Sequence, residues 1–210
     1  MIVEPTASES TTNSGRADGR RARGDQSRQA VLVAAQEAFG ELGYEATSVE
    51  IIASRANVTK GSLYHHFADK RALFEAVLER VQRMMVVSVG RAAQRAGSDP
   101  LLLFEKAIGA YLDASQDHVI ARIVLVDGPV VLGGARWEAI DSTHWGAQLR
   151  AAVDALAGPS VRRPVREALA VALNGAIGAA AKRVSADPTT RPAAMAALRC
   201  LARGIAQGRG

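Results

Sequence analysis

The sequence predicts an all-α protein in which a small N-terminal domain is followed by a larger helical C-terminal domain. Apolar residues recur at helical spacing along most of the chain, and no stretch of useful length shows the two-residue alternation of a strand. Alanine is abundant and aromatic residues make up only 4% of the sequence, which favours helices packed closely through small side chains. With 210 residues, the chain is long enough for one or two domains with a real core.

The first helix is expected from about Asp25 to Leu42. Its apolar stripe follows helical spacing and consists of Val31, Ala34, Ala35, Ala38 and Leu42. Residues 1–22 are expected to form a disordered basic arm. Its first part, residues 1–15, is rich in Ser, Thr and Glu, and the segment from Arg16 to Arg28 is locally basic.

Two short helices joined by a tight turn are predicted between Thr47 and Lys70. Thr47 can cap the first of them, and Glu50, three residues on, would complete a capping box. This helix is expected to end near Ala56. Asn57 then tolerates the left-handed backbone conformation that a tight turn needs.

The second short helix is expected from about Lys60 to His66, with Thr59 as its cap. Leu63 and Phe67 are four residues apart and point back to the core. The other sides of this helix are too polar for ordinary core and too aromatic for ordinary surface, which is what a helix needs if it is to lie in a DNA groove. Asp69 then caps a third, longer helix.

The two helix starts and the polar face carry groups that suit DNA. Lys60 can reach a phosphate or a guanine edge, and Gly61 lets the start of the helix approach closely. Thr47 and Ser48 present hydroxyl and backbone N–H groups at the other helix start, where they could clamp a phosphate. The expected DNA-binding residues are Thr47, Ser48, Lys60, Gly61, Ser62, Tyr64, His65, His66, Lys70 and Arg28.

Each of these residues, taken alone, has a simpler explanation. Two adjacent histidines are usually a surface accident, and Lys-Gly-Ser is usually a turn. A metal site at His65 and His66 is not expected, because adjacent helical residues diverge by about 100° and a helical metal pair usually sits at i, i+4. DNA binding is inferred from the whole arrangement, in which caps, core anchors and polar face are in register.

From Arg28 to Phe74 the chain also resembles the DNA-binding domain of the tetracycline-repressor (TetR) family of bacterial transcription regulators. The matching residues are Val31, Leu32, Ala34, Ala35, Phe39, Gly43, Tyr44, Thr47, Ser48, Val49, Ile52, Ala53, Ala56, Val58, Thr59, Gly61, Leu63, Tyr64, His66, Phe67, Lys70 and Leu73. Asn57 departs from the glycine that the family often has there, although asparagine can adopt the same backbone. The resemblance implies a homodimer with a helix-turn-helix domain at residues 23–70 and a ligand-sensing and dimerisation domain at residues 71–210.

The helix that starts at Asp69 is expected to continue to about Arg95, which is long enough to bridge the two domains. A loop or broken helix start is expected around Asp127-Gly128-Pro129, with Gly133-Gly134 soon after. The other helices are expected at residues 101–115, 117–126, 137–157, 161–185 and 192–207.

The last two of these helices could simply belong to the core. By resemblance to the family, they are instead the dimer interface and pair with their twins as a four-helix bundle. DNA recognition also favours a dimer, because one short recognition helix reads only a few base pairs. Two copies related by two-fold symmetry on a palindrome about double the binding free energy.

A ligand pocket is expected among the middle helices, which offer apolar and aromatic groups with a few polar anchors. The candidate ligand-binding residues are Phe104, Ile108, Tyr111, His118, Arg122, Trp137, His144 and Trp145. Each of them could equally be ordinary core when taken singly. Residues 127–141 also resemble a segment seen in one branch of the family's C-terminal domains.

The net charge of +5 does not by itself identify a DNA-binding protein. Residues 1–70 contain about as many acidic as basic side chains, so the excess lies elsewhere. Only the segment from Arg16 to Arg28 is locally basic, and it either contacts the DNA backbone or minor groove or is a free tail.

No membrane partner, cofactor, metal or catalytic activity is expected. There is no apolar run long enough for a membrane span, and the N-terminus is polar rather than a signal peptide. Cys200 is the only cysteine, so no internal disulfide can form and a cytoplasmic location fits. The sequence lacks a nucleophile motif, a phosphate loop and clustered carboxylates with a histidine at metal spacing, which argues against an enzyme.

The expected function is a ligand-responsive repressor that binds a palindromic operator as a dimer and is released by a small-molecule effector. The ligand would shift the long helix from Asp69 and change the spacing of the two reading helices, which requires tighter ligand binding to the form that is off DNA. Activation instead of repression stays open, because the sign depends on where the operator lies. The alternative function is a dimeric helical small-molecule binding protein without an operator.

Overall fold

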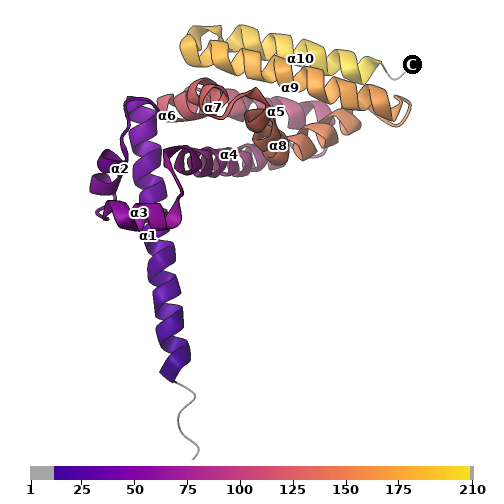
Figure 1. Ribbon diagram of the computed structural model, residues 1–210. Coiled ribbons are helices and arrows are strands. Elements are labelled where there is room, and N and C mark those ends of the chain that lie inside the picture. Colours follow the sequence, from indigo (N-terminus) through magenta and orange to yellow (C-terminus); the bar gives the residue numbers. More distant parts are fainter. Residues whose placement is uncertain (1–11, 209–210) are drawn as a thin grey trace, which may run out of the picture.

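The structure confirms the all-α fold. It is a computed structural model that describes the backbone of residues 12–208 and the side chains of residues 23–208, and every regular element in this range is a helix. Figure 1 shows a small N-terminal group of helices at one end, a long helix that leads away from it, and a layered group of C-terminal helices.

The first helix, α1 (Thr12–Leu42), begins well before the predicted start at Asp25. Residues 12–22, which were expected to belong to a disordered arm, are therefore helical, and α1 projects beyond the N-terminal group of helices in Figure 1. Extending an existing helix gains one hydrogen bond for each residue fixed, whereas starting a separate helix is costly. The rest of the predicted arm, residues 1–11, lies outside the described residues.

Two short helices, α2 (Val49–Arg55) and α3 (Lys60–His66), pack against α1 and form the predicted helix-turn-helix. Between them, Asn57 has a φ of 52°, the left-handed turn conformation predicted for it. Thr59 caps α3 as predicted, because its hydroxyl accepts a hydrogen bond of 3.1 Å from the backbone N–H of Ser62. The shared core consists of side chains that are at most 2% exposed: Val31, Leu32, Ala35, Ala38, Phe39, Ile52, Leu63 and Phe74.

The long helix α4 (Lys70–Gln94) belongs to both parts of the molecule. Asp69 caps it, since its carboxylate accepts a hydrogen bond of 2.7 Å from the backbone N–H of Ala72. Near its start, Phe74 is buried against α1, and α4 also packs against α5 and α8 of the C-terminal domain, which are described below. The helix therefore contacts both the N-terminal and the C-terminal groups of helices.

The C-terminal domain contains α5 (Pro100–Ala114), α6 (His118–Ile120), η1 (Ala121–Asp127), α7 (Gly128–Leu132), α8 (Gly134–Ala157), α9 (Arg163–Ala186), η2 (Pro188–Thr190) and α10 (Arg191–Gln207). The predicted break is confirmed at Gly133 and is wrong at Asp127-Gly128-Pro129: η1 is a π-helix that continues directly into α7, and α7 ends before Gly133, whose φ is 76°. Pro129 lies inside this continuous helical segment, although it has no backbone N–H to donate.

Helices α9 and α10 pack against each other at the side of the molecule that lies farthest from α3 in Figure 1. Several of their apolar side chains face outward: Val165 is 40% exposed, Val171 is 75% exposed and Leu201 is 49% exposed. Among the described helices, none combines the length and the apolar character that crossing a membrane requires.

Candidate DNA-binding surface and effector cavity

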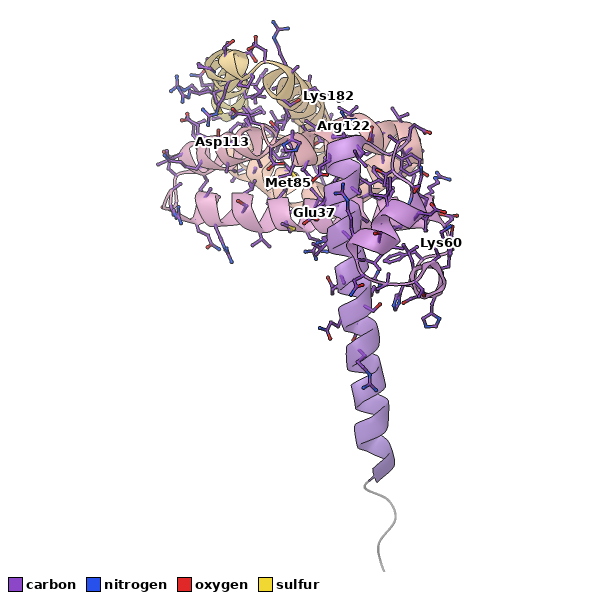
Figure 2. All side chains as sticks on the ribbon, turned by 90° about the vertical axis from the view of Figure 1, so that its left-hand side faces the viewer. Glu37, Lys60, Met85, Asp113, Arg122 and Lys182 are labelled. Atoms are coloured by element: carbon purple, nitrogen blue, oxygen red, sulfur yellow. The ribbon has the colours of Figure 1, made fainter. Side chains whose placement is uncertain are left out.

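The outer face of α3 brings most of the predicted DNA-binding residues together. Leu63 is fully buried and Phe67 is 5% exposed, so these two side chains hold the helix against the core. The residues left on the outer sides are the exposed Lys60, Gly61, Tyr64 and His65 and the half-buried Ser62 and His66. Figure 2 shows Lys60 at the outer edge of the N-terminal domain, away from the C-terminal helices.

An acidic side chain that was not among the predicted site residues also lies on this surface. Glu50 of α2 forms an ion pair with Lys60 of α3, and both side chains are more than half exposed. The hydrogen bond from Lys60 lowers the pKa of Glu50 to about 2, so its carboxylate is ionised near neutral pH. Because DNA phosphates are also anions, Glu50 competes with them for Lys60. From the sequence, Glu50 was expected to complete a capping box with Thr47, and its contact with Lys60 was therefore not predicted.

Thr47 is not available to DNA, so its inclusion among the binding residues was wrong. It is 1% exposed, and its hydroxyl donates to the carbonyl of Gly43 at 2.7 Å and lies 3.1 Å from that of Ala38. The cap of α2 is instead Ser48, whose hydroxyl accepts a hydrogen bond of 3.3 Å from the backbone N–H of Ile51. The turn after α1 brings two carbonyls over Thr47, and this tertiary contact decides which of the two adjacent hydroxyls caps the helix.

Thr47→Val is expected to destabilise the protein by about 1–3 kcal/mol, because a valine of similar shape leaves buried carbonyls without a donor. Thermal unfolding at a fixed protein concentration measures the loss. Thr143→Val is the matched control: the Thr143 hydroxyl donates to Ala139 at an exposed position, so its removal is expected to change stability by no more than about 0.5 kcal/mol. Equal effects of the two substitutions would contradict the role given to the buried hydroxyl.

Lys70 was predicted to reach DNA, but its ammonium group is used within the domain. It donates to the carbonyls of Tyr44 at 2.9 Å and Thr47 at 3.0 Å, and it lies 4.1 Å from the centroid of the Tyr44 ring. Two of its three N–H groups are therefore engaged in holding the turn between α1 and α2 against α4. Arg28 of α1 is exposed, and its guanidinium group lies 5.1 Å from the centroid of the Phe67 ring, beside α3.

The two histidines of α3 differ in their surroundings. His65 is exposed, whereas His66 is half-buried, and the ring centroids are 5.4 Å apart. Burial lowers the pKa of His66, and the neighbouring charges of His65 and Arg28 lower it further, so His66 is mostly neutral at pH 7. Within the described part of the chain, no group of three His, Cys, Asp or Glu side chains is placed to hold a metal ion.

A second candidate site is a cavity of about 1360 Å³ bounded by α4, α5, α8 and α9. The predicted ligand-binding residues that line it are Phe104, Ile108, Tyr111, Trp137 and Trp145. His118, Arg122 and His144 do not line it, so their assignment to the pocket was wrong. His118 and Arg122 belong to α6 and η1, which pack against α1, and Figure 2 shows Arg122 at the end of α1.

The cavity also contains a buried carboxylate that the sequence did not single out. Asp141 is 6% exposed, and its Oδ2 atom accepts a hydrogen bond of 3.0 Å from the side-chain amide of Asn174. Burial raises the pKa of Asp141, and the bond from Asn174 opposes this rise in part. Trp137, Asp141 and Trp145 are spaced four residues apart along α8, and this spacing is the signal that could have placed the carboxylate between the two indoles.

The segment from α6 to α7 lies between the cavity and the N-terminal domain. This segment contacts the turn after α1 through the hydrogen bond from Tyr44 N–H to Asp127 Oδ2 (2.9 Å). It and the start of α8 contact the first turns of α4 through the hydrogen bond from Arg71 Nη2 to the Leu132 carbonyl (3.0 Å) and the ion pair between Arg136 and Glu75. Packing is tight where α6 crosses α1: a Cβ atom placed on Gly40 would lie 2.5 Å from Cγ1 of Val119.

Comparison with protein families gives two matches that together span most of the chain. A family model described as bacterial regulatory proteins of the tetR family matches residues 31–77. A model described as the C-terminal domain of tetracyclin repressor-like proteins matches residues 103–205.

Individual relatives agree with these matches. The HTH-type transcriptional activator FasR of Mycolicibacterium smegmatis is 38% identical over 99 residues, which cover 47% of this chain and 45% of FasR. The HTH-type transcriptional repressor BepR of Brucella suis is 32% identical over 93 residues, which cover 44% of each chain. The chain thus matches less than half the length of these two curated relatives. A solved TetR-family transcriptional regulator from Pectobacterium atrosepticum is 32% identical, with a TM-score of 0.73 and coverage of 88% of this chain and 96% of that one.

Proposed function

The chain belongs to the TetR family of bacterial regulatory proteins, and we propose from this premise that it is a ligand-responsive repressor in the cytoplasm. In this proposal a homodimer binds a palindromic operator and is released when a small molecule occupies the cavity. The observation that carries the proposal is α3, because Leu63 and Phe67 anchor it and leave a polar, aromatic face exposed.

The proposed DNA contacts come from the N-terminal domain. Tyr64, with a side chain that is 50% exposed, and His65 would reach base edges in the major groove, since both combine a flat ring with a hydrogen-bonding tip. Lys60 and the N–H groups around Ser48 and Gly61 would contact phosphates and fix the orientation of the helix. Arg28 stands beside α3 on α1 and would add a further phosphate contact.

A dimer is proposed through α9 and α10. The outward-facing Val165, Val171 and Leu201 supply apolar surface that a second copy would cover. Two copies of α3 could then enter successive major grooves, whose centres are roughly 34–36 Å apart on one side of the duplex. This arrangement explains why a palindromic operator is proposed.

The operator proposal is tested with the DNA that lies upstream of the protein's own gene. Nuclease protection of a palindrome is expected, with an affinity that falls steeply as salt increases because bound cations are released from the phosphates. Binding without sequence preference, or no protected palindrome, would leave the alternative of a dimeric small-molecule binding protein without an operator.

The protein is proposed to repress transcription while it is bound to the operator. Ligand binding would release it from the DNA and so allow transcription. The two curated relatives include an activator, FasR, and a repressor, BepR. A reporter gene with the operator at its start site is expected to lose expression when the protein is present. Increased expression would reverse the sign and leave the operator proposal intact.

A route from the cavity to the N-terminal domain is proposed through η1. Trp137 lines the cavity, and its indole N–H donates to the carbonyl of Val124 in η1 at 3.1 Å. Leu125 of η1 also lines the cavity, and η1 ends at Asp127, which accepts the hydrogen bond from Tyr44. Short π-helical turns within helices occur frequently at functional sites. A ligand that moves Trp137 or Leu125 would therefore move η1 relative to the N-terminal helix-turn-helix domain, called the reading domain below.

Asp127→Ala is expected to weaken operator binding roughly 2- to 10-fold, because the lost hydrogen bond to Tyr44 contributes about 0.5–1.5 kcal/mol to holding the reading domain in place. Anisotropy of a labelled operator measures the affinity. Asp127→Asn retains an acceptor oxygen and serves as the control that should bind almost like the wild type. Equal affinities of all three proteins would remove this contact from the proposed route.

Operator affinity is expected to rise as pH falls from about 7.5 to 5.5, where histidine ordinarily titrates. The pKa of His66 is lowered in the free protein, so the ring is neutral at the upper pH and its proton uptake is shifted toward the acidic end of this range. A protonated ring is attracted to phosphate, and binding therefore takes up a proton. His66→Gln is expected to flatten the pH profile measured on a labelled operator, and an unchanged profile would assign the proton uptake to another group.

A further inference from the structure

The cavity holds one charged group that is buried away from water. Asp141 is 6% exposed, and it forms no ion pair with any described residue. Asn174 supplies its hydrogen bond, to one carboxylate oxygen only. A buried carboxylate without a cationic partner is costly, and the raised pKa of Asp141 reflects this cost; a cationic partner in the cavity would relieve it.

Two other polar side chains, Gln82 and Tyr111, lie near this carboxylate, and neither of them carries a positive charge. The amide of Gln82, a fully buried residue of α4, is close enough to favour ionised Asp141, yet within the described residues neither amide atom has a hydrogen-bond partner. Tyr111 also faces Asp141, and the carboxylate contributes to the raised pKa of this phenol, which burial raises most. Among the described residues, the positively charged group that favours ionised Asp141 is His144, which does not line the cavity, and no lysine or arginine pairs with Asp141.

The remaining wall suits a cation with an apolar body. The rings of Tyr111 and Trp145 meet edge to face, with centroids 5.2 Å apart, and Trp137 lies one helical turn before Asp141. Aromatic faces attract cations, and the attraction increases where water is excluded. Phe104 and Ile108 supply apolar surface nearby.

Charges at the edges of the cavity do not reverse this preference. The other charged lining residues are Glu138, Arg150, Arg163, Glu167 and Lys182, and all of them are exposed. Arg163 and Glu167 also pair with each other at 2.9 Å. Exposed charges are screened by water and salt, so Asp141 dominates the electrostatics of the interior.

We propose that the cavity binds an apolar or aromatic amine, with its ammonium group on Asp141 and its body against Tyr111 and Trp145. This inference rests on the proposed function, since it names the chemical class of the effector. The volume of about 1360 Å³ leaves room for a body larger than one ring. An anionic ligand of the same shape would place a second acidic group beside Asp141 and is expected to bind more weakly.

Three probes of one shape test the head group: naphthylmethylamine, naphthylmethanol and naphthoic acid. Both tryptophans of the chain line the cavity, so quenching of intrinsic fluorescence in the full-length protein reports binding. The amine is expected to bind at least about tenfold more tightly than the alcohol, which corresponds to about 1.4 kcal/mol. The acid is expected to bind most weakly.

Asp141→Asn is expected to bring the amine and the alcohol within about twofold of each other, because the shape is kept and the charge is lost. Glu138→Gln removes an exposed carboxylate one turn earlier on α8 and is expected to keep the full preference. Loss of the preference in Glu138→Gln, or its survival in Asp141→Asn, would overturn the assignment to Asp141. The wild-type series stands even where Asp141→Asn fails to fold, since equal binding of amine and alcohol, or tighter binding of the acid, refutes the proposal.

The outcome is separable from the test of DNA binding. A protein that prefers the amine and protects no palindrome keeps the cavity assignment and loses the regulator proposal. A protein that protects an operator but shows no preference for the amine keeps the regulator proposal and loses the assignment of the ligand class.

Discussion

Lys60→Ala is expected to weaken operator binding about 10- to 100-fold, because a hydrogen bond to a charged group such as a phosphate contributes about 1.5–3 kcal/mol. Lys60 stands at the start of α3, and its side chain is 55% exposed at the outer edge of the domain. Its loss leaves the core anchors Leu63 and Phe67 untouched, so thermal stability and the dimer are expected to stay the same. Anisotropy with operator and with random DNA measures the effect.

The kind of contact that Lys60 makes is read from the salt dependence. A phosphate contact predicts uniform weakening on all sequences and a salt slope reduced by about 1, whereas a base contact predicts relaxed specificity at one operator position. Glu50→Gln is the matched variant, because it removes the competing anion from the same ion pair, and it is expected to strengthen binding. If Lys60→Ala dissociates the dimer or leaves operator binding unchanged, α3 does not read DNA in the proposed way.

Phe74→Ala is expected to destabilise the protein by about 3–5 kcal/mol, the usual range for removing a buried phenyl ring. Phe74 is fully buried, and its ring meets those of Phe39 and Tyr44 edge to face, with centroids 5.1 and 5.2 Å away. It lies on α4, so its loss loosens the contact between the reading domain and the helix that leads to the cavity. Operator binding is expected to fall together with stability.

Chemical denaturation at a fixed protein concentration measures this loss, because the stability of a dimer depends on concentration. Phe74→Leu keeps most of the volume and is expected to lose less than half as much stability as Phe74→Ala. A loss below about 1 kcal/mol for Phe74→Ala, the size typical of an average substitution, would contradict the central place given to this aromatic cluster.

The helix-turn-helix could be predicted in detail because local chemistry determines it. Thr59 and Asp69 cap helices through contacts within three residues, and Asn57 adopts a backbone that few residues tolerate. The prediction of the cap of α2 was wrong because contacts between residues farther apart in the chain determine it. Thr47 and Ser48 are both good caps, and only the carbonyls of Gly43 and Ala38 determine which of them is buried.

The cavity was predictable only in part. Aromatic residues on α5 and α8 were identified because large side chains are prominent in a chain with few of them. Asp141 was missed because an aspartate on a helix is usually exposed, and its burial depends on α9, which supplies Asn174 from 33 residues away. The π-helix at η1 was predicted as ordinary helix, because the apolar pattern of residues 117–126 does not distinguish the two.

The close crossing at Gly40 limits how freely this protein can exchange parts with its relatives. A chimera that takes the first helix from another regulator with any side chain at this position would force a Cβ atom to within 2.5 Å of Val119. The two halves would separate or tilt, and the transmission through Asp127 and Tyr44 would fail even if both halves folded. A working hybrid should therefore take Gly40 and Val119 from the same parent protein. The exchange point then has to lie outside the contact between α1 and α6, and not at the end of the helix-turn-helix.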